Sequence, residues 1–444
     1  MKSDDALLVA WEETLARKGD APAIFDTRGE VLRTFREVER RAREVEAELI
    51  SRPQDEVYPI DIGNHPDWPS RLLASLRRRL VALPLEGSVT RQQRDAALAV
   101  CNASSAGGWG ERRPVLLKLT SGTTAAPRAI RFRSEQLVAD CIQICDTMEI
   151  GPDDLNFGVI PLSHSYGFSN LVTPLLVRGV PLVVSRDRMP RAVLDDLART
   201  GATVFPGMPV FFQAFCEMEN APPLPKLRLC ISAGAPLPLE IARKFRDKFQ
   251  RSIHSFYGSS ECGGICYDRE ARLLEPGFVG PPMRGVQLDL LEPDAPASLI
   301  RVRSAAAGDG YFPEPDEEKL GGGSFAPDDL LSASNEGFRI VGRISDVINV
   351  AGKKVNPAEV EAELLRFAGV RAAVVFGLSS TLRNEEVAAC VVADESVRET
   401  ELLEFCRGRL SGWQVPKRIF FLDEVPVNER GKVSRRALAQ RFGS

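Results

Sequence analysis

Short apolar runs alternate with amphipathic stretches over residues 157–249, and this alternation limits the fold more than any other feature of the chain. The apolar runs, which predict strands, are residues 157–161, 180–185, 203–205 and 227–232. The amphipathic stretches, which predict helices, are residues 191–200, 209–219 and 238–249. Because strands and helices that alternate at this spacing are typical of parallel sheets covered by helices, we predict an α/β fold with mainly parallel strands.

A different pattern begins after Gly342 and predicts a second domain. Its expected strands are residues 345–350, 370–376, 386–392 and 418–422, and its expected helices are residues 357–367, 399–410 and a closing helix from Ser434. Residues 276–342, which are rich in glycine and proline, predict a more irregular chain. We therefore predict a large N-terminal domain of layered α/β subdomains, residues 1–342, and a small α+β C-terminal domain, residues 343–444.

Composition excludes several classes of protein. The net charge of −4 gives no electrostatic footprint for nucleic acid. The nine cysteines are scattered, and with three histidines in the chain, none close in sequence to the pairs Cys141/Cys145 and Cys262/Cys266, buried free thiols are favoured over a zinc site. The N-terminus lacks the apolar core of a signal peptide, and the most apolar stretch, residues 171–184, is interrupted by prolines and an arginine. We predict a soluble, cytoplasmic protein without a membrane span.

The stretch Leu117-Lys-Leu-Thr-Ser-Gly-Thr-Thr-Ala-Ala-Pro-Arg128 carries the strongest chemical signal. A short apolar strand runs into four hydroxyl residues around one glycine and then reaches a cation. Hydroxyls and free backbone N–H groups can donate to phosphate oxygens, and Arg128 can supply positive charge. The pattern is not that of the Walker A loop, which requires G-x-x-x-x-G-K-[ST]. From the residues alone, a polar turn and a phosphate loop both remain open.

The same stretch resembles the phosphate loop T-S-G-[ST]-T-G-x-P-K-G of the adenylate-forming superfamily, which includes acyl- and aryl-CoA synthetases, peptide-synthetase adenylation domains and firefly luciferase. Thr120, Ser121, Gly122, Thr123, Thr124 and Pro127 match this pattern, whereas Ala125, Arg128 and Ala129 replace glycine, lysine and glycine. The resemblance implies that residues 120–124 and Arg128 bind ATP phosphates, with Thr120 also catalytic. Arginine keeps the charge but has a different geometry, and the lost glycines stiffen the loop.

Residues 161–167, Pro-Leu-Ser-His-Ser-Tyr-Gly, are similar to the P-x-x-H-x-x-G segment of acyl- and aryl-CoA synthetases. The resemblance implies that His164 lines an acyl pocket, together with Phe168, Ala233 and Gly263. Amino-acid-activating relatives place an aspartate here, and none stands between Pro161 and Asn170. The resemblance therefore implies an acid without an α-amino group. The small residues after Glu261 indicate a deep pocket, which favours an aryl or longer-chain acid.

Two further segments resemble the nucleotide site of the superfamily. Residues 232–237 resemble its adenine wall, where Gly234, Ala235 and Pro236 let the backbone approach a flat base. Residues 255–261 resemble its Y-G-x-[ST]-E motif, which implies that Tyr257 packs on adenine beside Gly258, that Ser260 meets the α-phosphate, and that Glu261 holds Mg²⁺ as a catalytic group. These roles suit the chemistry, because Mg²⁺ prefers carboxylates and phosphate oxygens.

The last motifs concern the C-terminal third of the chain. Asp329 aligns with the aspartate that binds ribose in relatives, and Arg343 matches the G-R-x-D-D motif, with a catalytic and nucleotide-binding role. Ser345 stands at the position of the hinge aspartate, which implies a mobile C-terminal domain. Gly352 and Lys354 are implied to line a pantetheine tunnel. Residues 426–435 resemble the P-x-x-x-x-G-K-x-x-R motif, which implies that Lys432 is the catalytic lysine.

The resemblance, closest to the AMP-forming acyl- and aryl-CoA synthetases, implies a carboxylic acid–thiol ligase. It would use ATP and Mg²⁺ to activate an aryl or aliphatic acid as acyl-AMP and then transfer the acyl group to coenzyme A, and the chain could form a homodimer. Two alternatives stay open: a ligase that loads the phosphopantetheine of an acyl carrier protein, and a degenerate nucleotide or acyl-adenylate binder without catalysis. A serine hydrolase is disfavoured, because Cys262 stands where G-x-S-x-G requires glycine.

Overall fold

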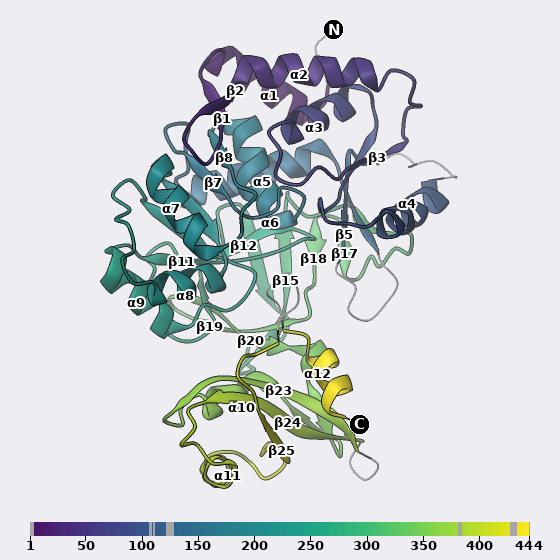
Figure 1. The fold of residues 1–444 in the computed structure, drawn as a ribbon. Helices are drawn as coiled ribbons and strands as arrows, with labels where there is room; N and C mark the ends of the chain where they lie inside the picture. Colours follow the sequence, from purple (N-terminus) through teal and green to yellow (C-terminus); the bar gives the residue numbers. More distant parts are fainter. Residues whose placement is uncertain are drawn as a thin grey trace. The chain divides into compact units, whose positions relative to one another are not determined.

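The structure is a computed structural model that describes residues 4–105, 109, 112–120, 128–380, 384–426 and 433–443 (Figure 1). The chain divides into two compact units. Unit 1 comprises Met1–Asp289, Arg301–Ala326 and Ser334–Arg339, and unit 2 comprises Leu290–Ile300, Pro327–Ala333 and Ile340–Ser444. The longest segment of unit 2 therefore begins close to the sequence-based boundary at residue 342, and two shorter segments join it. The assignment of separate functional roles to residues 1–342 and 343–444 stays a prediction.

Unit 1 contains an eight-stranded sheet whose central strands are parallel, among the described residues. Its order is β12-β11-β10-β9-β7-β8-β1-β2. The parallel strands are β7 (Asn156–Gly158), β8 (Leu182–Val184), β9 (Val204–Gly207), β10 (Leu229–Ser232), β11 (Ile253–Ser259) and β1 (Pro22–Phe25). The edge strands β12 (Gly263–Tyr267) and β2 (Val31–Thr34) pair antiparallel with their neighbours. The α/β fold predicted from the alternating pattern is confirmed.

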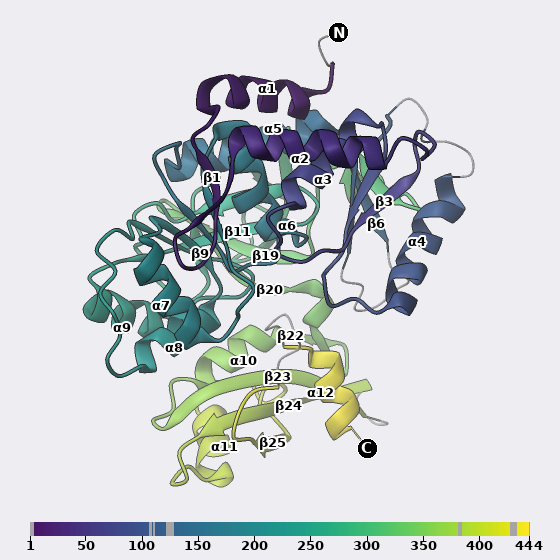
Figure 2. The same cartoon turned by 45° about the horizontal axis from the view of Figure 1, so that its top comes forward.

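Helices accompany this sheet, and their ends have recognisable signals. They are α1 (Ala6–Lys18), α2 (Phe35–Glu48), α3 (Trp68–Arg77), α5 (Ser134–Met148), α6 (Ser165–Gly167), the π-helical turns η1 (Phe168–Val172) and η2 (Pro174–Arg178), α7 (Pro190–Thr200), α8 (Pro209–Glu217) and α9 (Leu239–Phe249). Thr34 and Glu37 form a capping box at the start of α2. Gly201 ends α7 in the left-handed conformation, which glycine adopts easily. Figure 2 shows α1, α2 and α3 gathered at one end of unit 1.

Aromatic packing fixes α8 on the sheet. The ring of Phe205, in β9, lies 5.5 Å from the ring of Phe212 and 5.7 Å from that of Phe215, both on α8. These rings are fully buried, as is Phe245 of α9, whose ring meets Phe212 edge to face. Burial of each such side chain contributes about 1.5–3 kcal/mol to stability. The packing holds the strand that ends at Gly207 and thereby the loops that follow it.

A second sheet of unit 1 carries the phosphate-loop stretch. Its order is β16-β6-β5-β4-β3, formed by β3 (Val57–Ile60), β4 (Val81–Pro84), β5 (Leu116–Leu119), β6 (Ala129–Phe132) and β16 (Gly310–Phe312). Strands β3, β4 and β5 are parallel, whereas β5, β6 and β16 are joined antiparallel. The helix α4 (Arg91–Ser105) connects β4 to the segment before β5.

The glycine- and proline-rich zone is more regular than its sequence pattern predicts. It holds β13 (Phe278–Gly280), β14 (Val286–Leu290), β15 (Ser298–Ser304), β17 (Leu320–Gly321), β18 (Ser324–Phe325), β19 (Asp329–Ser334) and β20 (Gly337–Arg343). Within unit 1, β13 pairs with β20 and β15 with β18; within unit 2, Ser298 of β15 pairs with Leu331 of β19. These strands of two to seven residues are too short for a clear period-two pattern.

Unit 2 is an α+β fold. Its elements are the 3₁₀ turn η3 (Ile344–Asp346), β21 (Ile348–Val350), β22 (Lys353–Val355), α10 (Pro357–Leu364), β23 (Val370–Ser380), β24 (Asn384–Ala393), α11 (Glu399–Arg407), β25 (Arg418–Phe421) and α12 (Arg435–Phe442). Side chains of β23 and β24 alternate between two clusters. One face packs with residues of α10 and α11, and the other with residues of α12. This alternation is what a sheet covered on both faces requires.

One predicted strand of unit 2 is wrong in its extent. Residues 345–350 were expected to form a single strand, but the chain first makes the η3 turn, in which the Val347 N–H donates to the Ile344 carbonyl. Only Ile348–Val350 is extended and paired. The turn separates Asp346 from the strand, and its carboxylate accepts a hydrogen bond from Arg435.

Candidate active site

The topology gathers three predicted site segments at one edge of a sheet. Strands β9, β10 and β11 lie side by side and parallel, and β7 pairs parallel with β9. The His164 segment follows β7, the segment with Gly234 follows β10, and Glu261 follows β11. In open α/β sheets, ligands bind at the carboxyl ends of the strands. The carboxyl edge, defined as the segments that follow β7, β9, β10 and β11, is therefore the candidate site of unit 1.

The His164 segment and the Glu261 segment are joined by a hydrogen bond. His164 caps α6, and its Nδ1 accepts from the Tyr166 N–H at 3.2 Å. One residue later, the Ser165 hydroxyl is 2.9 Å from the hydroxyl of Ser260. Tyr166 reaches the same edge, because its hydroxyl donates to the carbonyl of Ile231 in β10. A segment expected to face the acid thus contacts one expected to face the α-phosphate.

Glu261 lies in the tight turn between β11 and β12. The Ser259 hydroxyl accepts from the N–H groups of Glu261 and Cys262, each at 3.2 Å, and so fixes this turn. Gly258 permits it, since an added Cβ would stand 2.7 Å from the Gly263 carbonyl oxygen. The Gly308 N–H donates to the Glu261 carbonyl at 2.8 Å. The backbone of Glu261 is therefore held from both sides of the turn.

The phosphate-loop stretch is the connection of the β5–β6 hairpin. The connection begins at Thr120 and ends at Arg128. The backbone N–H and the hydroxyl of Thr120 both donate to the Arg128 carbonyl, at 2.8 and 3.1 Å. The predicted phosphate ligands between them, Ser121, Gly122, Thr123 and Thr124, lie outside the described residues. The described part shows an antiparallel hairpin whose connection starts at Thr120 and closes at the cation.

Tyr311 links that cation to the predicted metal carboxylate. The Arg128 guanidinium lies 4.2 Å from the centre of the Tyr311 ring and 3.9 Å from Asp316. The Tyr311 hydroxyl donates to Oε1 of Glu261 at 3.2 Å. Burial, together with the nearby Glu261 carboxylate, raises the pKa of Tyr311, so the phenol stays neutral and remains a donor. Arg128, Tyr311 and Glu261 therefore form one connected group.

The residues expected at adenine differ in exposure. Gly234, Ala235 and Pro236 are exposed and form the loop after β10, where Gly234 has a φ of +86° that favours glycine. Tyr257, which was expected to pack on the base, is buried within β11. The structure places an exposed backbone segment and an aromatic residue on adjacent parallel strands.

One of the predicted acyl-pocket residues, Gly263, lies against a buried carboxylate. Phe168 is buried in η1, and Ala233 is buried at the end of β10. Gly263, with a φ of +70°, has no room for a side chain, because a Cβ would stand 2.0 Å from an oxygen of Asp140. Asp140 projects from α5 and accepts from the Ser169 hydroxyl and the Gly264 N–H. The small residues after Glu261 thus make room for Asp140, a residue that the sequence analysis did not identify.

In unit 2, the structure brings Asp329 and Arg343 together. Nε of Arg343 donates to Oδ1 of Asp329. The Asp329 side chain is 6% exposed and that of Arg343 58% exposed, so the arginine extends from the pair toward solvent. The contact with a charged donor holds the buried carboxylate in one orientation.

The remaining predicted residues of unit 2 lie on turns. Ser345 is in η3, and its side chain lies outside the described part. Gly352, with a φ of +86°, forms the β21–β22 turn, where its N–H donates to Asn349 at 2.9 Å. Lys354 is exposed in β22. The predicted catalytic residue Lys432 lies outside the described residues, which resume two residues before α12.

Besides Asp140, sequence reasoning missed Tyr311 and the contacts of Arg435. Tyr311 stands in a zone read as irregular, and only the aromatic pair Tyr311-Phe312 after a glycine hinted at a strand there. Arg435 donates to Asp346, Glu361 and the Val375 carbonyl, which ties the η3 turn to the start of α12. The arginine of the C-terminal motif was noted, but its partners are far away in the sequence.

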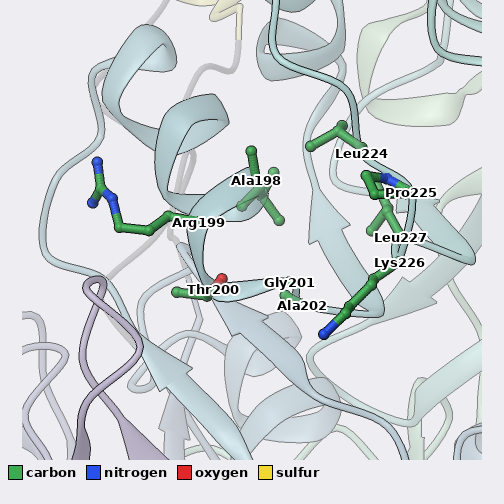
Figure 3. A pocket seen from close by; sticks show the side chains of 10 residues that line it. Ala198, Arg199, Thr200, Gly201, Ala202, Leu224, Pro225, Lys226 and Leu227 are labelled. Carbon is green, nitrogen blue, oxygen red and sulfur yellow. The ribbon is translucent and has the colours of Figure 1, made fainter.

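Two surface pockets in the described part of the chain are lined by residues other than the predicted site residues. A small one of about 130 Å³ lies between the end of α7 and the loop before β10 (Figure 3). Arg199 and Lys226 line it, and Arg199 pairs with Asp196. A groove of about 540 Å³ is lined by residues such as Arg269 and Glu336. The candidate site therefore rests on the carboxyl edge and its contacts.

A parallel sheet with an acidic turn at its carboxyl edge, linked through Tyr311 to the cation that closes a hairpin connection rich in hydroxyl residues, is the arrangement expected of an enzyme that binds a nucleoside phosphate. The model of the AMP-binding enzyme family matches residues 109–311, and that of the AMP-binding enzyme C-terminal domain matches residues 359–432. Together the two matches span well over half of the chain. The protein belongs to the AMP-binding, or adenylate-forming, enzyme family, which confirms the resemblance found in the sequence.

Curated relatives and solved structures agree with this assignment. Feruloyl-CoA synthase of Amycolatopsis is 29% identical over 74% of this chain and 70% of its own length. The 3,4-dihydroxybenzoate–[aryl-carrier protein] ligase of Bacillus anthracis is 28% identical over 73% of each chain. The ATP-bound structure of MatB from Rhodopseudomonas palustris covers 98% of both chains with a TM-score of 0.85 and 23% identity, which shows the shared fold. Across the part of the chain that the structure describes, no helix is long and apolar enough to cross a membrane.

Proposed function

We propose that this chain is an AMP-forming carboxylic acid–thiol ligase. It would join the carboxylate of an acid to the α-phosphate of ATP and release pyrophosphate. A thiol sulfur would then attack the acyl carbon, forming the thioester while the acyl–phosphate bond breaks, so that AMP and the thiol proton are released. The observation that carries the proposal is the connected group Arg128–Tyr311–Glu261 in a chain that belongs to the AMP-binding enzyme family. In that group, Tyr311 contacts both Arg128, a cation of the phosphate-loop stretch, and Glu261, the acidic residue expected to act at the phosphates.

The roles of the individual residues follow from their contacts. Thr120, the 121–124 loop and Arg128 would bind phosphate oxygens, and Ser260 the α-phosphate, while Asp329 would bind the ribose hydroxyls. Arg343, held by Asp329, would stabilise negative charge as pyrophosphate departs. His164, Phe168, Ala233 and Gly263 would line the acid's pocket, and Tyr257 with the 234–236 loop would enclose adenine.

Glu261 is the residue that would hold Mg²⁺. Its carboxylate fits this ion, because the Tyr311 hydroxyl orients one oxygen and Mg²⁺ takes one or two carboxylates together with phosphate oxygens. When bound, the ion would neutralise phosphate charge that repels an incoming carboxylate.

For the second half-reaction we propose coenzyme A as the thiol, with Gly352 and Lys354 beside its pantetheine. Relatives supply two precedents, since one forms a CoA thioester and another loads an aryl-carrier protein. Lys432 would act in adenylation, and rotation at Ser345 would exchange it for Gly352, with residues 343–444 as the moving domain. A homodimer and a cytoplasmic location stay predictions.

ATP–pyrophosphate exchange over a panel of aryl, short-chain and fatty acids tests the proposal. Exchange that depends on one class of acid is expected, followed by thioester formation when CoA is supplied. An arm with holo acyl carrier protein in place of CoA tests the alternative acceptor. ATP binding without exchange for any acid would instead support the non-catalytic binder, which the substituted loop residues Ala125, Arg128 and Ala129 favour.

A further inference from the structure

A lysine of unit 1 is buried where none of the recognised motifs places one. Lys118 lies in β5, two residues before Thr120 and opposite Ile130 of β6. It is only 6% exposed. Burial lowers the pKa of Lys118, and the negative charges of Asp140 and Glu261 act in the opposite direction. A lysine is rarely buried to this extent without a partner, so its surroundings matter.

Aromatic faces surround the ammonium group of Lys118. Its Nζ lies 4.6 Å from the centre of the Phe132 ring and 5.2 Å from that of the Phe168 ring. Such rings attract a cation, but they accept no conventional hydrogen bond. Within the described ranges, the ammonium forms neither a hydrogen bond nor an ion pair with a carboxylate oxygen. Its three N–H donors are therefore short of acceptors.

The nearby carboxylate does not supply those acceptors. Asp140 is 5% exposed, and the hydrogen bonds of its two oxygens come from other described residues. Oδ2 accepts from the Ser169 hydroxyl, and Oδ1 accepts from the Gly264 N–H at 3.1 Å. Lys118 and Asp140 attract each other electrostatically without touching. The cluster of Lys118, Phe132, Phe168 and Asp140 offers no described acceptor oxygen within hydrogen-bonding distance of the ammonium. A ligand that binds the ammonium must therefore supply such an oxygen.

Two residues predicted to line the acid pocket contact this cluster. Phe168, whose ring faces Lys118, was assigned to that pocket from the sequence, and so was Gly263, which packs directly against Asp140. The Glu261 carboxylate, expected at the phosphates, is within electrostatic reach of Lys118. The ammonium therefore lies beside a residue predicted to face the acid and interacts electrostatically with the carboxylate predicted to act at the phosphates.

We propose that Lys118 determines specificity by binding a second anionic group of the substrate, so that the activated acid is a dicarboxylic acid or a similar acid with two anionic groups. This inference rests on the proposed ligase function and narrows its substrate class. An ammonium–carboxylate contact is charge-assisted and strong. A monoacid with an apolar tail would instead bring no acceptor to the donors of Lys118, a difference against which a protein site can discriminate strongly. Both aryl and aliphatic acids can carry a second carboxylate.

Pyrophosphate exchange with matched acids tests the assignment. Adipate is compared with hexanoate, and terephthalate with benzoate, for the wild type, Lys118→Met and a control, Lys226→Met. Lys226 is an exposed lysine of unit 1 that lines the small surface pocket. In the wild type and the control, kcat/KM for at least one diacid should exceed that for its monoacid roughly ten- to hundred-fold. In Lys118→Met this ratio should fall to about one or below.

A second variant and a binding measurement guard against misfolding. Lys118→Met leaves Asp140 buried without its compensating charge, so Lys118→Met/Asp140→Asn is measured beside it. In thermal melts, a diacid should raise the wild-type midpoint more than its monoacid does, and both variants should lose this difference.

Each outcome separates this inference from the function on which it rests. If the ratio of kcat/KM for the diacid to kcat/KM for its monoacid is the same in the wild type and in Lys118→Met, the inference is wrong. The proposed ligase function is then unaffected. An equal loss for both acids in Lys118→Met also overturns it, because Lys118 would then act on the nucleotide or on the reacting carboxylate. If no acid supports exchange and no diacid shifts the midpoint, the proposed function and the inference both fail.

Discussion

The two ends of the parallel sheet in unit 1 differ in how their polar groups are satisfied. At the amino end, Asp154 precedes β7, Thr203 precedes β9 and Arg228 precedes β10. Asp154 accepts from the Thr203 hydroxyl at 2.8 Å, from Nε of Arg228 at 2.7 Å and from the Gly151 N–H at 2.9 Å. At the carboxyl end, the loop from Gly234 to Pro236 is exposed, and Glu261 is oriented by Tyr311.

This difference separates residues that hold the sheet together from residues arranged for a ligand. The carboxylate of Asp154 is 8% exposed and surrounded by donors from three strand ends, so its interactions are internal. At the carboxyl edge, the described contacts of the Ser260 and Glu261 side chains are one hydrogen bond each, to Ser165 and to Tyr311. We expect changes at the amino end to reduce stability and changes at the carboxyl end to reduce activity.

The largest effect is expected for Glu261→Gln. Loss of the carboxylate charge should lower the rate of pyrophosphate exchange about 100- to 1000-fold, a typical loss for one preorganised electrostatic group. The melting midpoint should change little, because the amide can still accept from Tyr311. The matched control is Glu240→Gln, an exposed glutamate of α9 that pairs with Lys244. If Glu261→Gln catalyses pyrophosphate exchange at the wild-type rate, Glu261 is not a ligand of the proposed metal ion.

The next effect tests the amino end. Asp154→Asn removes the charge to which Arg228 binds and should lower the free energy of unfolding by about 2–3 kcal/mol, somewhat less than for a fully buried pair because Arg228 is partly exposed. Exchange activity per folded molecule should be retained, since Asp154 lies at the opposite end of the strands from Glu261. Urea or thermal unfolding measures the first quantity and exchange at 15 °C the second. Lost activity in a stable variant would contradict the division between the two ends.

Tyr311 allows a finer test at the carboxyl end. Tyr311→Phe removes the hydroxyl that orients Glu261 but keeps the ring below Arg128, and should lower kcat for exchange about ten-fold. Tyr311→Leu also removes the ring and should raise KM for ATP in addition, because Arg128 loses its aromatic support. If both variants behave alike, the cation–π contact has no role in positioning Arg128.

The comparison also explains how much could be predicted from the sequence. The parallel sheet follows from local periodicity, and the order of motifs places His164, Gly234 and Glu261 after strands. Each of these depends on a few neighbouring residues, which a sequence pattern can register. Because these strands are parallel neighbours, their topology alone predicts that His164, Gly234 and Glu261 lie at the carboxyl edge.

Contacts between distant segments could not be predicted in this way. Tyr311 reaches Glu261 across 50 residues and Asp140 meets Gly264 across 124, and neither pair leaves a local pattern. Lys118 was read as part of an apolar strand, because one lysine does not disturb the pattern of β5. The short strands between Phe278 and Arg343 could not be predicted for a related reason. Their strand conformation depends on pairing with distant partners more than on their own sequences.

The smallest effect concerns the acid side of the stability profile. Burial alone would raise the pKa of Asp154, but the hydrogen bonds from Arg228, the Gly151 N–H and Thr203 outweigh it, and the pKa is lowered in the folded protein. A carboxyl group with a lowered pKa contributes stability above its unfolded value, near pH 4, and this contribution is lost as the pH falls through the folded pKa. The melting midpoint of the wild type should therefore approach that of Asp154→Asn as the pH falls below about 4. If the difference between the melting midpoints of the wild type and of Asp154→Asn stays constant from pH 7 to pH 3, ionisation of the Asp154 carboxylate does not cause its stabilising effect.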